Sequence, residues 1–218
     1  YKNNSSVIIF ASGVSNSQET ETASFNREET LLLEAISSCK ERTLVYFSTC
    51  SIYDISTRET AYVQHKLKME RLVKENCSHF YIFRLSQVVG KSSSPTLINY
   101  LFDAIRNKRN IKINEYSTRN LIHIDDVFSI AEHIIENKVY LNEITNIASG
   151  FNMFVVDIIR HIEGILNITA LYTLVEYGSS FEIDVGKIRK INCAQKLFSD
   201  KYIESILGQY NEESSQLT

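Results

Sequence analysis

Short runs of consecutive apolar residues alternate, in the first half of the chain, with longer segments whose apolar residues recur every three to four positions. Buried strands are predicted at residues 6–13, 42–54 and 80–90. Helices are predicted at residues 24–40, capped by Ser24 or Asn26, and at residues 60–76. Strands and helices in strict alternation require crossover connections. The pattern therefore predicts a doubly wound α/β domain with a parallel sheet.

Beyond Gly90 the pattern is less regular. A loop at residues 91–95 holds the only proline, and a frayed tail is predicted at residues 211–218. Between them we expect helices at 96–109, 125–138 and 154–166, a short strand at 110–114 and a buried strand at 143–149. The N-cap of the helix at 125–138 is expected at Asp125 or Asp126.

Composition narrows the class of protein. The 218 residues are 44% hydrophobic and 22% charged with a net charge of −3, which is typical of a globular protein with a large core. The near-neutral balance gives no reason to expect nucleic acid as a partner. No apolar run approaches the length of a membrane span, so no membrane partner is expected.

The cysteines and histidines show no metal-binding pattern. The four cysteines lack C-x-x-C spacing, and the five histidines lack the spacing of metal ligands, so we predict no metal site. Four widely spaced cysteines are expected to remain reduced, which favours a cytoplasmic protein. The sequence offers no histidine that could be placed as a catalytic partner of Cys50, so Cys50 is expected to be a small packed residue.

Tyr62 and Lys66 stand four positions apart in the segment "YVQHK" of the second predicted helix. The spacing places both side chains on one helix face. An ammonium near a phenol favours the phenolate, so the pair could transfer protons. The spacing alone also fits a packed tyrosine beside a solvated lysine, and the surrounding sequence must decide between these readings.

Five ordered blocks supply that context: "VYFSTCSIYD", "YVQHK", "RLSQVVG", "RNLIHIDDV" and "NEITNIASGFNMFVVDIIRHIEGIL". Together they resemble the extended short-chain dehydrogenase/reductase family, which includes NAD-dependent nucleotide-sugar epimerases and dehydratases. The resemblance covers the chain from Val7 to about Tyr210. It implies a Rossmann-type sheet with a smaller C-terminal α+β substrate-binding region.

The resemblance also implies a division of the chain. Residues 1–90 and 119–150 would belong to the cofactor-binding domain, whereas residues 91–118 and 151–210 would form the substrate region. The family's Gly-rich pyrophosphate turn does not occur among the seven scattered glycines. We therefore expect that the first strands of the domain are missing before Tyr1.

Residue roles follow from the resemblance, block by block. Tyr62 is implied as the acid/base, Lys66 as the residue that tunes it and holds the cofactor, and Thr49 as the hydroxyl that orients the substrate. Contacts with NAD or NADP are implied for Ala11, Ser12, Gly13, Phe47, Ser48, Tyr62, Lys66, Leu85 and Ser86. Contacts with a nucleotide-sugar substrate are implied for Thr49, Ser51, Gln87 and Arg119. Gln87 replaces the asparagine common in the family.

Two further expectations concern the reaction. The family's 4,6-dehydratases follow the threonine with an Asp-Glu pair, but Cys50 and Ser51 stand here, so dehydration is disfavoured. Epimerisation or reduction of a keto-sugar remains. The expected setting is the synthesis of surface polysaccharides. The alternative is a non-catalytic relative that senses the cofactor or acts as a scaffold.

Smaller expectations complete the picture. His123, Asp125 and Asp126 are expected to form a structural turn and helix cap, and Lys108, Arg109 and Lys112 a solvated face. The helices at about 24–38 and 61–75 are expected to form a homodimer through a four-helix bundle. The apolar residues available for that contact are Leu31, Leu32, Leu67 and Leu72.

Overall fold

A parallel four-stranded sheet forms the centre of the larger lobe. The computed structural model of the chain describes residues 6–90 and 96–215. The strands lie in the order β1-β2-β3-β8 and comprise Val7–Phe10, Thr43–Thr49, Phe80–Leu85 and Glu143–Ile147. All three neighbouring pairs are parallel. The predicted α/β fold class is confirmed.

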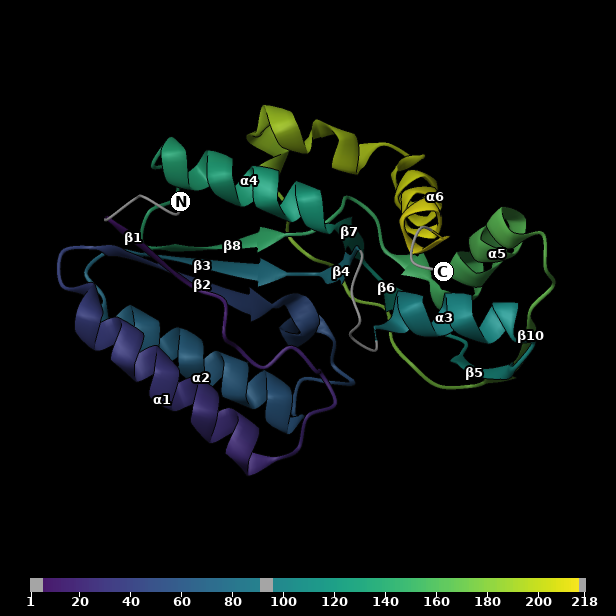
Figure 1. Ribbon diagram of the computed structural model, residues 1–218, viewed down its shortest axis with the longest axis horizontal. Helices are drawn as coiled ribbons and strands as arrows, with labels where there is room; N and C mark the ends of the chain where they lie inside the picture. Colours follow the sequence, from purple (N-terminus) through teal and green to yellow (C-terminus); the bar gives the residue numbers. More distant parts are fainter. Residues whose placement is uncertain (1–5, 91–95, 216–218) are drawn as a thin grey trace.

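Helices cover both faces of this sheet (Figure 1). Helices α1 (Thr22–Cys39) and α2 (Ala61–Asn76) lie on one face, and α4 (Ile124–Glu136) lies on the other. Successive side chains of β2 point to opposite faces. Tyr46 therefore packs in the cluster that contains residues of α1 and α2, whereas Val45 packs in the cluster that contains residues of α4. The sheet is thus buried on both sides.

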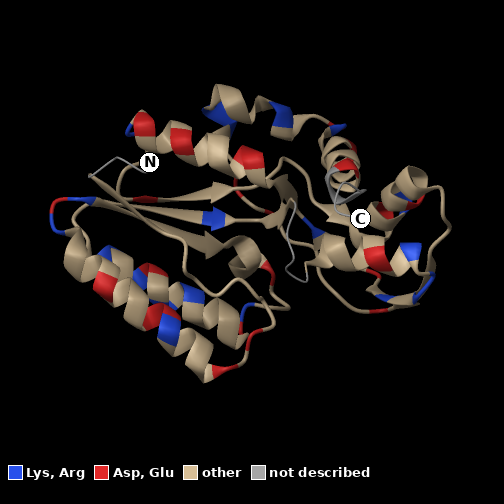
Figure 2. Ribbon diagram, viewed as in Figure 1, with Lys and Arg blue, Asp and Glu red and all other residues tan. Residues whose placement is uncertain are grey.

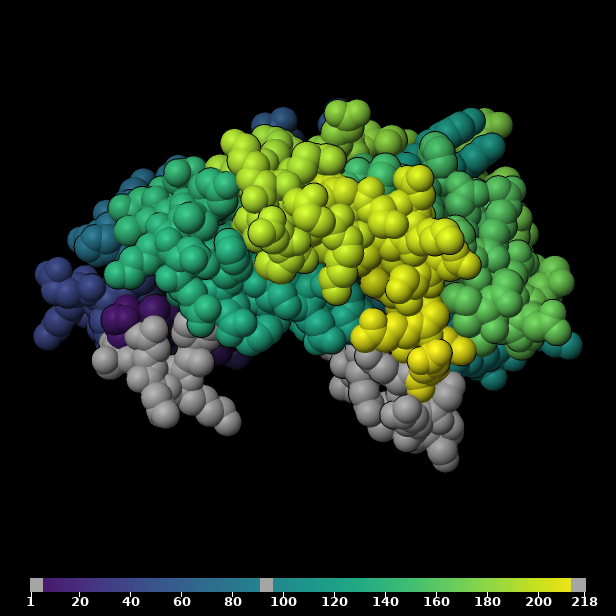
Figure 3. Space-filling view, turned by 90° about the horizontal axis from the view of Figure 1, so that it is seen from above, coloured from purple at the N-terminus to yellow at the C-terminus, as the bar shows by residue number. Residues whose placement is uncertain are grey.

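A smaller lobe lies beyond the carboxyl ends of the strands (Figure 1). It contains α3 (Leu97–Arg106), β5 (Asn110–Asn114), α5 (Val155–Leu166), β10 (Leu171–Val175) and α6 (Tyr202–Ser215). Strands β5 and β10 pair in parallel. The chain from η2 (Ile188–Lys190) through η3 (Asn192–Phe198) to α6 lies between α4 and the smaller lobe, as Figure 3 shows.

Two short ribbons connect the lobes. Strands β4 (Gln87–Val89) and β7 (Leu121–His123) pair in parallel. Strands β6 (Thr118–Arg119) and β9 (Met153–Phe154) pair antiparallel. These ribbons carry the chain from the edge of the large sheet into the smaller lobe.

Several element boundaries differ from the predictions. Glu21 is the N-cap of α1 and makes no side-chain cap bond, so the predicted caps Ser24 and Asn26 are wrong. The strand predicted at 80–90 is two strands, because the chain leaves the large sheet at Ser86. Strand β10 was not predicted: four of its five residues are exposed, so it lacks the signature of a buried strand.

The later helix ends also differ. His123 caps α4 by accepting a hydrogen bond from the Asp125 backbone N–H, so neither Asp125 nor Asp126 is the cap. Buried Asp126 instead accepts a hydrogen bond from the Tyr202 hydroxyl at 2.7 Å and forms an ion pair with Lys196. Residues 211–215 continue α6 where a tail was predicted. The predicted loop at 91–95 lies outside the described residues.

Charges of both signs intermingle on the outer faces of α1 and α2 (Figure 2). The basic run of Lys108, Arg109 and Lys112 is exposed, as predicted, and Arg109 pairs with Asp103. None of the helices in the described part of the chain is both long enough and apolar enough to cross a membrane.

Two glycines should respond oppositely to alanine. Gly178 has φ +110°, and a Cβ there would lie 2.8 Å from the Ser117 backbone nitrogen. Gly164 lies inside α5, where a Cβ would meet nothing within 4 Å. In urea unfolding, Gly178→Ala should destabilise the fold by about 1–3 kcal/mol. Gly164→Ala should stabilise it by about 0.5–1 kcal/mol, and effects of equal sign would contradict this assignment.

Candidate active site

The carboxyl ends of β1, β2 and β3 form one edge of the large sheet. Thr49 lies beside Leu85 in the parallel register, and Leu85 lies beside Ile147. Just past β1, Ala11 and Ser12 are exposed. Most of the predicted cofactor-binding residues therefore meet at this edge, which is the usual position of ligands in such sheets.

Tyr62 and Lys66 lie on the inner face of α2. Thr60 caps this helix by accepting a hydrogen bond from the Val63 backbone N–H. Both side chains are buried, with 7% of Tyr62 and 3% of Lys66 exposed. The Lys66 ammonium nitrogen lies 6.0 Å from the centroid of the Tyr62 ring. The structure thus confirms that the two residues share a face, and this face is turned inward.

Glu28 of α1 reaches the same place and has no exposed surface. Its Oε1 lies 3.0 Å from the Lys66 Nζ and accepts a hydrogen bond from the Tyr46 hydroxyl at 2.7 Å. Its Oε2 accepts a hydrogen bond from the Val14 backbone N–H at 2.6 Å and lies 3.1 Å from the His65 Nε2. A carboxylate thus lies at the centre of a buried polar cluster, which we call the Glu28 cluster.

Burial opposes charge on Glu28, yet the pKa of this carboxyl is lowered from 4.5 to about 2. Hydrogen bonding with His65 and the charge of Lys66 are the main reasons. Burial also lowers the pKa of Lys66, and Glu28 opposes that shift. The two charges therefore stabilise each other in an environment that would otherwise disfavour both.

The pKa of the Tyr62 phenol is raised. Burial is the largest cause, hydrogen bonding with Thr49 lowers the pKa, and the charge of Glu28 raises it. The sequence predicted the opposite environment, in which Lys66 alone would favour phenolate. That prediction did not include the burial of the phenol, which is the largest cause of the raised pKa, or the charge of Glu28, which adds to it.

Gly13, in the loop after β1, lies against the Glu28 cluster. A Cβ at Gly13 would lie 2.7 Å from the Lys66 Nζ and 2.9 Å from the Glu28 Oε1. Such distances are shorter than van der Waals contact. The missing side chain at Gly13 therefore leaves room for the buried ion pair.

A second buried ion pair lies further along α2. Arg84 donates to both carboxylate oxygens of Glu70, at 2.8 and 2.6 Å. The Ser48 hydroxyl donates to the same carboxylate at 2.6 Å. Ser48, predicted to line the cofactor cleft, is therefore turned toward Glu70 inside the protein. Phe47 points to the other face and packs against Phe83.

The turn after β2 is a 3-10 helix, η1 (Cys50–Tyr53). Thr49 caps it by accepting a hydrogen bond from the Ser51 backbone N–H at 3.0 Å, and the two hydroxyl oxygens lie 3.0 Å apart. The Cys50 thiol is buried and donates to the Arg84 carbonyl. Burial raises the pKa of this thiol to about 12, so Cys50 is a packed residue as predicted.

Arg119 approaches from the smaller lobe. Its guanidinium donates to the Thr118 carbonyl at 2.7 Å. Burial lowers the pKa of Arg119, and the charge of Asp54 near η1 opposes this shift. The neighbouring Asn120 side chain fixes the strand by bonding to Ser149 through both its amide nitrogen and its oxygen.

Residues 176–184 run between the two lobes. The Ser179 hydroxyl donates to Asp54 at 2.8 Å, and the Asn146 side chain donates to the Asp184 carbonyl at 2.8 Å. The Asn152 side chain bonds to the Phe181 carbonyl. This segment therefore connects the turn after β2, the end of β8 and the loop before β9.

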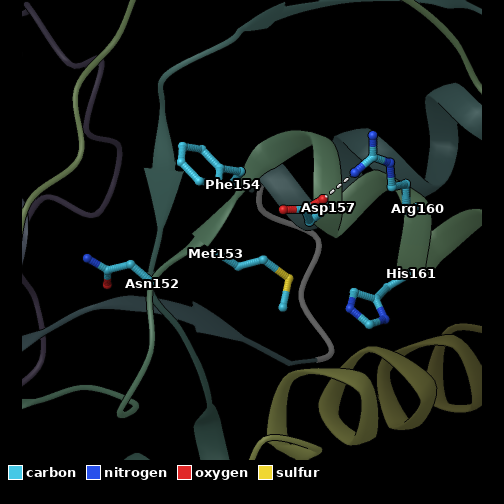
Figure 4. A pocket seen from close by; sticks show the side chains of 6 residues that line it. All are labelled: Asn152, Met153, Phe154, Asp157, Arg160 and His161. Carbon is cyan, nitrogen blue, oxygen red and sulfur yellow. Dashed lines mark hydrogen bonds and ion pairs between the residues drawn. The ribbon is translucent and has the colours of Figure 1, made fainter.

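A hollow of about 580 Å³ lies at the start of α5, in the region where the sequence predicts substrate binding (Figure 4). Its lining is Asn152, Met153, Phe154, Asp157, Arg160 and His161. Arg160 pairs with Asp157 at 2.6 Å. Met153 of this lining pairs with Arg119 across the β6–β9 ribbon. Within the described ranges, no cluster of His, Cys, Asp or Glu is arranged to hold a metal ion.

Sequence reasoning missed Glu28, Glu70 and Asp54. Glu28 stands in the polar stretch "NREET", which reads as a solvated helix face. One signal could have identified it: Glu28 lies four residues before Leu32, a fully buried apolar residue of α1, and therefore on the same face. Glu70 likewise follows Lys66 by four positions.

Comparison with known proteins supports the fold. A family model described as the NAD dependent epimerase/dehydratase family matches residues 4–148. No curated protein matches the sequence significantly. Solved structures with the same fold were found at identities that support the fold alone.

Three of these structures illustrate the range of proteins and bound cofactors that share this fold. A UDP-glucuronic acid 4-epimerase from Bacillus cereus, with UDP-glucuronic acid and NAD, has a TM-score of 0.79 and 19% identity over 98% of this chain and 76% of its own. A dTDP-glucose 4,6-dehydratase from Bacillus anthracis, with NAD, has a TM-score of 0.74 and 16% identity over 96% of this chain and 73% of its own. The protein RMD from Pseudomonas aeruginosa, with NADPH, has a TM-score of 0.76 and 13% identity over 98% of this chain and 82% of its own.

The lowered pKa of Glu28 makes a prediction about acid stability. A carboxyl whose pKa falls on folding stabilises the fold above its unfolded pKa of 4.5, and this contribution is lost as pH falls toward 2. The advantage of wild type over Glu28→Gln in urea unfolding should therefore shrink by about 2 kcal/mol between pH 6 and pH 3. Glu29→Gln is the control, because Glu29 pairs with the exposed Lys68 and is itself more exposed than Glu28. Equal pH dependence in both variants would contradict the prediction.

Proposed function

Because the chain belongs to the NAD-dependent epimerase/dehydratase family, we propose that it is an NAD- or NADP-dependent enzyme that acts on a nucleotide-activated sugar. The observation that carries the proposal is the position of Tyr62 and Lys66, which lie together on α2 at the sheet edge where Thr49 ends β2. UDP-glucuronic acid and NAD are bound in a structural neighbour, which supports this substrate and cofactor class.

The residues at the sheet edge fit a dinucleotide. Ala11 and Ser12 are exposed after β1, and Gly13 allows close approach of the backbone to Lys66. We assign these residues, with Leu85 at the end of β3 and Ser86 directly after it, to the cofactor. When bound, NAD or NADP would supply the hydride chemistry. Ser48 and Phe47 would support this site from within, because their side chains contact Glu70 and Phe83.

The protein's own contribution is proton transfer and orientation. Tyr62 would give a proton to, or take one from, the sugar oxygen at which the carbonyl forms or disappears. Thr49, whose hydrogen bonding lowers the Tyr62 pKa, would orient that oxygen. Lys66 would bind the cofactor and stabilise charge on the Tyr62 oxygen. Burial of the pair keeps water away from the reacting groups.

Epimerisation or keto-sugar reduction fits the site better than dehydration. A dehydratase of this family needs an acid and a base in the two positions after Thr49. Cys50 is buried with a pKa of about 12, and Ser51 is a hydroxyl bonded to Thr49. Neither side chain can act as the general acid or the general base of a dehydration at neutral pH.

The nucleotide end of the substrate is proposed to lie along the β6–β9 ribbon. Arg119 would bind the diphosphate, because a guanidinium can donate two parallel hydrogen bonds to phosphate oxygens. Ser51 and Gln87 would contact the sugar from the sheet edge. The hollow at the start of α5 adjoins this ribbon and offers further room for substrate (Figure 4).

We further propose a cytoplasmic homodimer that serves surface polysaccharide synthesis. The four cysteines are free thiols, which supports a reducing compartment. The outer faces of α1 and α2 would form the dimer contact. Leu31, Leu67 and Leu72 are partly buried and could contribute, but Leu32 is fully buried in its own core and cannot.

The first experiment tests turnover with the product of the complete reading frame that encodes this chain. NADH and NADPH are titrated by fluorescence, and a panel of UDP-, dTDP-, GDP- and CDP-linked 4-keto sugars is then added while absorbance is followed. Tyr62→Phe should retain cofactor binding and lose turnover by roughly 100-fold or more, because its proton donor is gone. Tyr100→Phe, at a 44% exposed tyrosine of α3, is the matched control.

Each result of this assay has a defined meaning. Cofactor consumption that disappears in Tyr62→Phe indicates a reductase. Cofactor binding without consumption leads to an NMR assay for epimerised product. Binding with neither reaction would favour the non-catalytic, cofactor-sensing relative, and absence of cofactor binding would refute the enzyme proposal.

Arg119→Lys separates substrate binding from chemistry. Lysine keeps the positive charge but cannot make two parallel bonds to a diphosphate. The KM for the nucleotide sugar should rise roughly tenfold to hundredfold while kcat changes little. Arg109→Lys, at an exposed arginine of the smaller lobe, should leave both constants unchanged. A loss confined to kcat would show that Arg119 does not bind the diphosphate.

A further inference from the structure

Glu28 is a fully buried carboxylate to which the proposed mechanism gives no task. It contacts Lys66 directly and joins three parts of the fold. These parts are the loop after β1 through Val14, strand β2 through Tyr46, and helix α2 through His65 and Lys66. A role for Glu28 in the reaction rests on the proposed function of the Tyr62–Lys66 pair.

The donors of the Lys66 ammonium show what Glu28 does. One N–H donates to the Glu28 Oε1 at 3.0 Å, and a second donates to the Tyr46 hydroxyl at 3.3 Å. The Tyr46 hydroxyl in turn donates to the same Glu28 oxygen. Glu28 therefore fixes the ammonium through a direct bond and through Tyr46. An ammonium has three N–H groups, so one N–H remains for a ligand beyond the two bonds found among residues 6–90 and 96–215.

We propose that Glu28 is the positioning residue of the Tyr62–Lys66 pair: its carboxylate holds the Lys66 ammonium against Gly13 and balances its charge, so that Tyr62 rests as a neutral proton donor. The chemistry favoured by this arrangement is proton donation to a substrate carbonyl oxygen. Glu28 itself does not touch the reacting atoms and acts only through Lys66.

The charges around Tyr62 support this inference. Lys66 lies on the same helix, with its Nζ 6.0 Å from the centroid of the Tyr62 ring, and the charge of Glu28 on α1 also acts on the Tyr62 phenol. The Tyr46 phenol of β2 interacts electrostatically with Tyr62 as well. Glu70 adds a negative charge near Lys66 from the next turn of α2, where it is paired with Arg84. Without Glu28, the ammonium would act on Tyr62 with no carboxylate bonded to it, and phenolate would become the favoured counter-charge.

A purely structural role for Glu28 is the competing explanation. The carboxylate ties α1 to the loop after β1 and to β2, so its removal could loosen the cluster without any electrostatic effect on Tyr62. Tyr46→Phe distinguishes the two roles. It removes the hydroxyl that links Glu28 to Lys66 but leaves both charges in place.

The experiment follows ionisation of Tyr62 directly by NMR in protein labelled with 13C at tyrosine Cζ. The Tyr62 signal is assigned by its loss in Tyr62→Phe. In Glu28→Gln, ionisation of Tyr62 should move to lower pH by about one unit or more. It should stay at the wild-type pH in Tyr46→Phe and in Glu29→Gln, the matched change at a half-buried residue of α1 that pairs with Lys68.

Glu28→Asp provides a second route that is less disruptive to folding. It keeps the charge but withdraws it from Lys66, so the downward shift should have the same direction and be smaller. Unchanged Tyr62 ionisation in both Glu28 variants, or an equal shift in Tyr46→Phe, would overturn the proposal. The measurement requires no turnover, so its failure is distinct from failure of the proposed enzyme activity.

Discussion

A carboxylate that is wholly removed from water must be neutralised, and at Glu28 the neutralising charge is the ammonium of Lys66. This requirement fixes more than two side chains. It draws α1 toward α2, holds the loop after β1 through the Val14 backbone, and determines where the Tyr46 hydroxyl lies. The part of the fold that would face cofactor is therefore organised around a buried ion pair.

The alternation of side chains along β2 explains how one strand serves both core and site. Val45 and Phe47 point toward the layer that contains α4, whereas Tyr46 and Ser48 point toward the layer of α1 and α2. There the Tyr46 hydroxyl donates to Glu28 of α1 and the Ser48 hydroxyl donates to Glu70 of α2. Only at Thr49, where the strand ends, does a hydroxyl become available at the edge of the sheet. The chemistry proposed here thus begins where regular pairing stops.

Much of this arrangement could be predicted from periodicity, because strands buried on both faces and amphipathic helices leave strong signals. The strand predicted at 42–54 was found at Thr43–Thr49, where it ends in the 3-10 turn η1. The helix predicted at 60–76 was found at Ala61–Asn76, with Tyr62 and Lys66 sharing a face. The electrostatics could not be predicted in the same way. Whether Glu28 faces water or the core depends on the packing angle of α1, which is a tertiary property, and the break at Ser86 depends on pairing with a distant strand.

Gly13, Glu28 and Lys66 also constrain one another in evolution. A side chain at Gly13 would collide with both charged groups, and loss of either charged group would leave its partner buried and uncompensated. Their substitution energies are therefore strongly non-additive. A lineage that keeps the pair must keep the glycine, and a lineage that abandons the carboxylate can enlarge the glycine only after the lysine has found another position. These three positions, from a loop and two helices, should therefore be kept or changed together.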